Sequence, residues 1–163
     1  MRSVSAAVLS LLGLACATSA IANDAVKRGE YLVRIMDCTG CHTGGALVGK
    51  PDPALFLAGS TIGFGVPGFG IFYPPNLTPD PKTGLGEWSE DDIVAAIRTG
   101  IRPDGRELAP VMPWRSYAAL TDEDARAVAA YLKSLPPVRS EVPPVTGPDE
   151  QAPAPYLSVV SPE

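Results

Sequence analysis

A glycine- and proline-rich stretch from Gly44 to Gly86 restricts the fold more than any other part of this 163-residue chain. Both residue types break helices, and proline cannot donate a hydrogen bond to a β-ladder, so little regular structure is expected here. The stretch is nevertheless too apolar for a disordered linker. A loop of this length inside a compact domain is expected to pack on a large apolar group that the sequence does not encode. The side chains that need such burial are Ile62, Phe64, Phe69, Ile71, Phe72, Tyr73 and Leu77.

Helical patterns stand on both sides of this stretch. Residues 23–37 predict a first helix. A capping box of Ser89 with Asp92 opens a second helix, which Gly100 is expected to end. Thr121 caps a third helix, whose apolar positions recur at helical spacing before a pair of prolines stops it. The chain is therefore predicted to be mostly α and to form one domain.

The pentapeptide Cys38-Thr39-Gly40-Cys41-His42 offers a candidate for the missing apolar group. On a helical turn, positions i and i+3 point to one side and i+4 lies beside them. Cys38 and Cys41 can therefore each form a thioether with a haem vinyl group, while His42 binds the iron. This spacing is the attachment signature of c-type haem. One covalent haem c would also serve as the core on which the loop packs, through Phe64, Phe69, Ile71, Tyr73 and Leu77.

Two other uses of the pentapeptide meet difficulties. A thioredoxin-like redox pair needs a thiolate stabilised at a helix start within a βαβ pattern, and no alternating strand precedes Cys38. A zinc ion needs four nitrogen or sulfur ligands, whereas residues 23–163 contain only Cys38, Cys41 and His42.

The sixth iron ligand separates electron transfer from chemistry on small molecules. His42 is the chain's single histidine, and Met36 lies just before Cys38, on the same side of the haem. Met112 lies in a loop between two prolines and is predicted to be the distal ligand. Ligation by His42 and Met112 raises the reduction potential and fills the iron. The alternative is a haem enzyme or gas sensor with an open sixth position, in which Met112 only packs.

The N-terminal residues predict export. An uncharged, apolar run follows Arg2 and ends at Ala20-Ile21-Ala22, which is typical of a signal peptide removed after Ala22. Cys16 resembles a lipidation site, and lipidation would anchor the protein to a membrane. The formal net charge of −5 argues against a nucleic-acid partner, because phosphate binding needs a basic face.

The chain resembles class I c-type cytochromes over about residues 24–137. It is similar to single cytochrome modules that serve bacterial periplasmic dehydrogenases for alcohols, sugars and related substrates. Many members carry several modules and a C-terminal amphipathic anchor, whereas this chain has one haem motif and a proline-rich tail. The matching motifs are Asn76-Leu77-Thr78-Pro79-Asp80, Thr83-Gly84-Leu85-Gly86, Trp88-Ser89, Asp104-Gly105, Met112-Pro113 and the final helix.

The resemblance implies roles for further residues. Gly29 would meet Tyr131 where the first and last helices cross. A carbonyl of Pro51 or Pro53 would accept a hydrogen bond from the ring of His42, as metal-bound histidines usually require. Other side chains would hydrogen-bond or neutralise the haem propionates, although ordinary aromatic packing and solvated arginines are the competing interpretations. These candidates are Tyr73, Trp88, Arg98, Arg102 and Arg106.

The sequence thus predicts a class I cytochrome c fold with its helices wrapped around one haem. The expected organisation is a signal peptide over residues 1–22, a cytochrome c domain over 23–137 and an extended tail over 138–163. We expect a periplasmic protein that carries single electrons and does not itself make or break substrate bonds. The expected partners are redox proteins, namely a dehydrogenase, an oxidase or another cytochrome. Membrane association is expected only through such a partner or through a lipidated Cys16.

Overall fold

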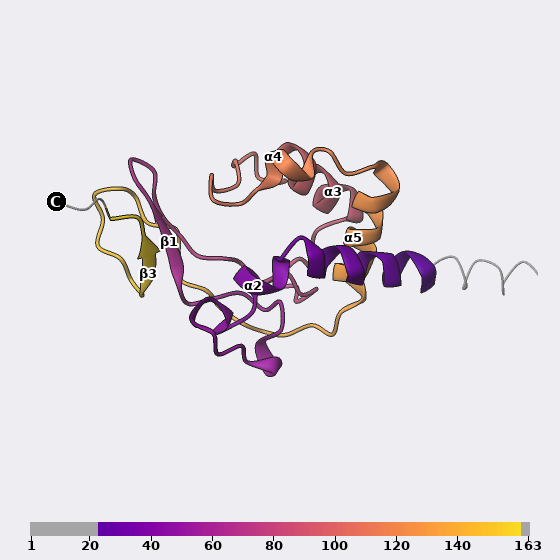
Figure 1. Cartoon of the computed structure of the whole chain (residues 1–163), viewed down its shortest axis with the longest axis horizontal. Helices are drawn as coiled ribbons and strands as arrows, with labels where there is room; N and C mark the ends of the chain where they lie inside the picture. Colours follow the sequence, from indigo (N-terminus) through magenta and orange to yellow (C-terminus); the bar gives the residue numbers. More distant parts are fainter. Residues whose placement is uncertain (1–22, 161–163) are drawn as a thin grey trace, which may run out of the picture.

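The structure is a computed structural model that describes residues 23–160. The expected signal peptide and Cys16 lie outside the described residues. A helix over residues 23–35 precedes the remaining elements. In chain order these are α2 (Cys38–His42), η1 (Ala46–Val48), η2 (Pro53–Leu55), β1 (Gly63–Val66), β2 (Gly70–Phe72), α3 (Glu90–Thr99), α4 (Trp114–Tyr117), α5 (Asp122–Ser134) and β3 (Tyr156–Ser158). The helices gather in one part of the molecule and the strands lie at the opposite end (Figure 1).

The helical core forms where the helix over residues 23–35 crosses α5. Gly29 lies at this crossing, and a Cβ atom there would stand 2.7 Å from Cβ of Tyr131 and collide with the backbone carbonyl of Ala127. The absence of a side chain therefore lets the two helices approach closely. Leu32 and Val33 are buried against α5 on the same face. The structure thus confirms the predicted meeting of Gly29 and Tyr131.

The caps of the later helices agree with the sequence patterns. The Ser89 hydroxyl accepts from the backbone N–H of Asp92, and the Asp92 carboxylate accepts from the backbone N–H of Ser89, so α3 has a complete capping box. Gly100 ends α3 with a positive φ of 76°, a conformation that glycine adopts at little cost. Thr121 caps α5 through the N–H of Asp124. The short helix α4 was not predicted.

The stretch from residue 44 to residue 86 contains more structure than its composition suggested. Two single-turn 3-10 helices are followed by the hairpin of β1 and β2, in which Phe64 pairs with Phe72. Phe69 stands at the hairpin turn and is 61% exposed, so the expectation that it packs on the haem is wrong. Ile71 is buried, but it is held by a backbone bridge to Thr146 rather than at the cavity described below.

The C-terminal segment packs on the domain along its length. It leaves α5, runs back beneath the helices and reaches the hairpin at the opposite end (Figure 1). There β3 pairs parallel with β1, in the register Phe64 to Leu157, so that the sheet has the order β2-β1-β3. None of the helices within residues 23–160 has the length and hydropathy that a membrane crossing requires.

Candidate functional site

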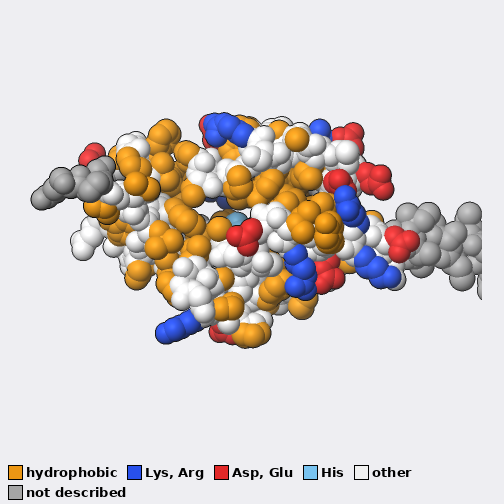
Figure 2. Space-filling view, in the orientation of Figure 1, with side chains coloured by type: hydrophobic (Ala, Val, Ile, Leu, Met, Phe, Trp, Pro, Cys, Tyr) orange, Lys and Arg blue, Asp and Glu red, His pale blue; other side chains and the backbone are white. Residues whose placement is uncertain are grey.

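A cavity of about 400 Å³ lies between the helices and the hairpin. Figure 2 shows it as a hollow with the histidine colour at its floor. Elements far apart in the sequence form its walls: α2, the hairpin, the end of α3, the loop before α4 and the C-terminal segment. The walls are mainly apolar, and they include Phe64, Phe72, Tyr73, Leu77, Trp88, Ile97, Leu108 and Met112. A cavity with this lining suits a large flat apolar group.

The helix α2 places both cysteines on the cavity wall. Asp37 precedes it in a left-handed conformation with φ of 56°, which turns the chain between the first helix and α2. Cys38 and Cys41 are free thiols that line the cavity. Burial raises the pKa of Cys38 to about 11 and also raises the pKa of Cys41. A redox-active pair needs a lowered thiol pKa, so this environment does not suit thiol–disulfide exchange.

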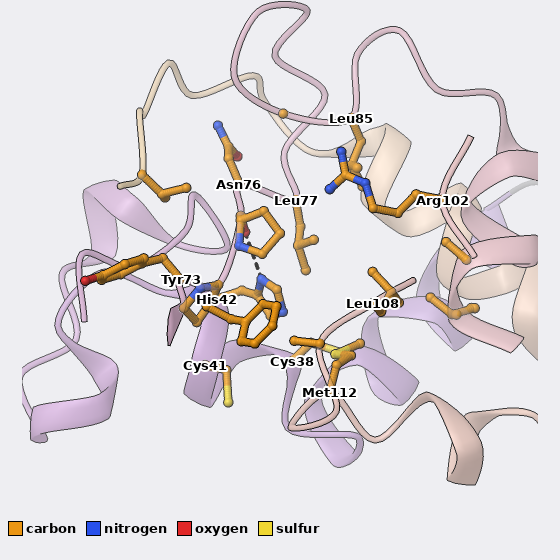
Figure 3. Close-up of a pocket in the computed structure, with 18 of the residues that line it drawn as sticks. Cys38, Cys41, His42, Tyr73, Asn76, Leu77, Leu85, Arg102, Leu108 and Met112 are labelled. Carbon is orange, nitrogen blue, oxygen red and sulfur yellow. Dashed lines mark hydrogen bonds between the residues drawn. The ribbon is translucent and has the colours of Figure 1, made fainter. Parts of the chain in front are cut away.

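His42 is buried at the end of α2 with its ring fixed by one hydrogen bond. Nδ1 lies 2.8 Å from the carbonyl oxygen of Pro75. A carbonyl can only accept, so Nδ1 carries the proton, and Nε2 of a neutral ring is left free to bind a metal. Figure 3 shows this second nitrogen turned into the cavity. Burial also lowers the pKa of His42, which favours the neutral, ligating form of the ring.

The predicted acceptor for His42, a carbonyl of Pro51 or Pro53, is therefore wrong. Those prolines lie in a turn whose backbone returns to Gly44, because Asp52 N–H donates to the Gly44 carbonyl at 2.8 Å. Pro75 instead follows β2, which brings its carbonyl beside α2. No sequence pattern predicts this choice, because the hairpin that carries Pro75 to the site has no period-two pattern of its own.

Met112 lines the same cavity from a separate segment, the loop between α3 and α4. Tight backbone turns hold it, since Met112 N–H donates to Ala109 and Trp114 N–H donates to the Met112 carbonyl. Met36 also lines the cavity, from the turn directly before α2. The cavity therefore brings His42 and Met112 together, and the choice of Met112 as distal ligand stays a prediction.

Two of the predicted propionate partners face the cavity as a pair of cations. Arg102 and Arg106 both line it, and the guanidinium of Arg102 stacks 5.3 Å from the ring centre of Trp88. Arg102 Nε lies 3.3 Å from Asp104, but the direction is too poor for a hydrogen bond, so this buried N–H has no acceptor. Burial, and then the charge of Arg102, lower the pKa of Arg106. An anionic group in the cavity would satisfy both side chains, which is the role that haem propionates would fill.

Two other predicted propionate partners are engaged elsewhere. Arg98 does not line the cavity, and its guanidinium pairs with Asp122 at the start of α5. Tyr73 lines the cavity with its ring, but its hydroxyl donates to the Ala154 carbonyl at 2.8 Å and accepts from the Ala154 N–H. The prediction that Arg98 and the Tyr73 hydroxyl contact the propionates is therefore wrong. Trp88 stays a candidate, because it lines the cavity beside Arg102.

Some cavity residues were missed by sequence reasoning. Tyr117 lines the cavity near the two cysteines, and its hydroxyl donates to the carbonyl of Met36 at 2.7 Å. Burial raises the pKa of Tyr117 to about 12, so the hydroxyl keeps its proton and remains a donor. The C-terminal segment contributes Val142 to Val145 to the wall. Their apolar pattern, two prolines between two valines, is a signal for burial, whereas the proline content of the segment predicts only an extended tail.

Fold and site together define the class: a small helical domain around one apolar cavity, with a C-x-x-C-H helix on one wall and a methionine loop on another. No group of three or more histidine, cysteine or acidic side chains within residues 23–160 is suited to hold a free metal ion. Residues 26–136 match the model of the family described as "Cytochrome c", and the chain belongs to that family. Membership implies covalent haem c, and the donor set described above fits it.

Curated relatives agree with this family. The chain is 42% identical over 132 residues to the gluconate 2-dehydrogenase cytochrome c subunit of Pantoea cypripedii, which is 80% of this chain and 28% of that protein. It is 42% identical over 106 residues to the cytochrome c subunit of the quinone alcohol dehydrogenase of Gluconobacter oxydans, covering 65% of this chain and 20% of the relative. A diheme cytochrome c-type protein of Cereibacter sphaeroides is 34% identical over 111 residues, which is 68% of this chain and 36% of that protein.

The chain thus spans between one fifth and just over one third of the length of these three relatives. The predicted family, the class I cytochrome c fold and the resemblance to cytochrome modules of dehydrogenases are confirmed. The relatives are named as cytochrome subunits, in line with the expectation that the chain is not the catalytic part of an enzyme. They do not favour the alternative of a haem enzyme or gas sensor.

Proposed function

We propose that this protein is a periplasmic, monohaem cytochrome c that passes single electrons from a dehydrogenase toward the respiratory chain. The observation that carries the proposal is the cavity that brings the C-x-x-C-H helix together with Met112. When bound there, a haem supplies one-electron chemistry at its iron. Cys38 and Cys41 would attach this haem, and His42 and Met112 would bind its iron.

The residues around the iron suit electron transfer rather than bond-making. The Pro75 carbonyl fixes the ring of His42 in one orientation, so little reorganisation is needed when the iron changes charge. The thioether of Met112 would favour ferrous iron and would leave no open position for small molecules. Arg102 and Arg106 would hold the propionates while the apolar walls exclude water.

A dehydrogenase is proposed as the electron donor because three kinds of relative carry that word in their names. These relatives are cytochrome subunits of gluconate, alcohol and fructose dehydrogenases. Each is much longer than this chain, so the proposal extends only to the class of donor. Oxidation of alcohols, sugars or sugar acids would then supply the electrons.

Spectroscopy on the purified protein tests the haem assignment. We expect one covalent haem per chain by mass and by pyridine haemochrome assay, and a low-spin ferric spectrum with the weak near-infrared band of methionine–iron ligation. A high-spin ferrous protein that binds carbon monoxide at once would instead identify an open sixth position and reject the electron carrier.

The partner and the compartment need separate measurements. Catalytic subunits of candidate dehydrogenases, each with its own substrate, should reduce the ferric protein in a stopped-flow experiment, with one electron taken per chain. Failure of all such donors to reduce a correctly assembled protein would reject the dehydrogenase as partner. Cell fractionation with N-terminal sequencing should find a soluble periplasmic protein that begins at Asn23, whereas a lipid on Cys16 would place it on a membrane.

A further inference from the structure

We propose that residues 138–146 form a strap that closes one wall of the haem cavity and keeps water from the haem edge. The proposal rests on the function proposed above, because its effect is on a bound haem. These residues lie outside the part of the chain that matches the cytochrome c family, which ends at residue 136. The wall therefore lies outside the matched family domain.

The first anchor of the strap is a buried polar network. The Val138 carbonyl accepts from Asn76 Nδ2 at 2.7 Å, and the Val138 N–H donates to Thr78 Oγ1 at 3.1 Å. Ser140 N–H donates to Thr83 Oγ1 at 3.1 Å. Asn76 and Thr78 are each only 1% exposed, so these hydrogen bonds are sheltered from water and costly to leave unmade.

This anchor stands on a rigid part of the site. Asn76 directly follows Pro75, whose carbonyl fixes the ring of His42. The backbone N–H of Leu77 donates to Leu57 at 2.8 Å, which ties the same loop to a fully buried residue of the core. The strap therefore starts from a segment that is hydrogen-bonded to the core and to His42.

The second anchor lies on the hairpin. Thr146 and Ile71 exchange two backbone hydrogen bonds, of 2.9 Å and 3.1 Å, and Thr146 is buried. Further along, Tyr73 and Ala154 exchange a reciprocal pair of hydrogen bonds. The segment between residues 140 and 146 is thus held at both ends while its middle spans the cavity.

The middle of the strap is suited to an apolar wall. Val142, Pro143, Pro144 and Val145 all line the cavity. Proline has no backbone N–H, so two successive prolines can face an apolar group without leaving a donor unsatisfied. Val142 packs so closely on Gly59 that a side chain there would collide with it. Ser140 and Thr146, on either side of this middle part, donate their backbone N–H groups to the two anchors.

The strap should raise the reduction potential of the bound haem. Water at the haem edge stabilises the more highly charged ferric state, so a dry wall favours ferrous iron. A change in the wall should therefore appear as a change in potential even where the fold is unchanged. This distinguishes a wall that shields the haem from a segment that only adds stability.

A matched set of valine variants tests this at full length. Val145→Thr puts a hydroxyl into the wall at nearly constant volume, and Val145→Ile keeps the wall apolar. Val145 lines the cavity and is 47% exposed, whereas Val159 lines no cavity and is 85% exposed, so Val159→Thr is the control. We expect Val145→Thr to lower the potential measured by redox titration, and the other two variants to match the wild type. Equal potentials in all four proteins would overturn the proposal.

A chain that stops after Pro137 removes the strap entirely. We expect it to carry covalent haem and to have a lower reduction potential than the wild type. Small reductants should also reduce its haem faster, measured at high salt so that charge effects are screened. A truncated holoprotein with the wild-type potential and accessibility would also overturn the strap. If the truncated chain does not accumulate, the valine set decides alone. A wild type without one low-spin covalent haem would reject the proposed function instead, so the two failures are distinguishable.

Discussion

At the scale of single residues, the cavity contains two methionines with different positions. Met112 comes from the loop before α4, and Met36 from the turn before α2. We predict that Met112→Ala opens the iron, so that the ferrous protein binds carbon monoxide rapidly and its reduction potential falls, because a thioether favours ferrous iron. Rapid-mixing absorption and redox titration measure both effects. Met36→Ala is the control and should change neither; the reverse pattern would assign the ligand to Met36.

Gly29 gives a second prediction at this scale. Any side chain there meets both Tyr131 and the backbone of Ala127. We expect Gly29→Val to lower the free energy of unfolding by roughly 1–3 kcal/mol through overpacking. Adding Tyr131→Ala removes the ring but keeps Cβ of residue 131, so it should recover only part of this loss, because that Cβ and the Ala127 carbonyl both remain. Denaturant titration measures the coupling, and Gly147→Ala, whose added Cβ would have no neighbour closer than 3.5 Å, is the control. Additive effects within about 0.5 kcal/mol would show that the ring of Tyr131 is not the obstacle.

At the scale of the elements, α3 depends on its capping box. Ser89 and Asp92 satisfy each other's backbone N–H groups, and the hydrogen bonds from Ser89 lower the pKa of the Asp92 carboxyl. We predict that Ser89→Ala costs about 1 kcal/mol at neutral pH. Ser116→Ala, in the short helix α4, is the control and should be close to neutral.

The pH dependence of that loss follows from the direction of the pKa shift. A carboxyl whose pKa is lowered by folding stabilises the protein above its unfolded pKa of about 3.9, and this contribution disappears as the pH falls through the folded value. The difference in stability between the wild type and Ser89→Ala should therefore become smaller in acid. Thermal melts between neutral pH and about pH 3 check this. A difference that stays constant would mean that the carboxylate takes no part in the cap.

Some of these elements could be predicted from the sequence and others could not. The caps at Ser89 and Thr121 depend on neighbours within a few residues, so local chemistry predicted where α3 and α5 begin. The thioether helix is equally local. The hairpin was not predicted, because its strands are short and rich in glycine and therefore lack the usual period-two pattern. The partner of His42 and the pairing of Arg98 were missed for a related reason, since each depends on contacts between distant segments.

At the scale of the whole molecule, the core is divided between side chains and a group that the chain does not encode. The described residues surround an apolar cavity of about 400 Å³, and an empty space of that size in a small domain forfeits a large part of its packing. We predict that a protein made with Cys38→Ala and Cys41→Ala, and freed of haem, shows no cooperative thermal unfolding. Calorimetry and near-ultraviolet circular dichroism measure this against the haem-bound protein. A sharp, native-like melt without haem would show that the side chains alone form a sufficient core.

The strap follows the cytochrome c domain in the sequence, and this order has a consequence for how the protein would be made. The thiols proposed to receive the haem lie at residues 38 and 41, so they leave the ribosome before residues 138–146. In a protein exported as proposed above, they would also cross the membrane first, and a wall supplied by residues 138–146 would not obstruct the entry of the haem. Loading and closure would then be separated in time by the order of synthesis. The same residues placed at the N-terminus would close the cavity before its contents had been delivered.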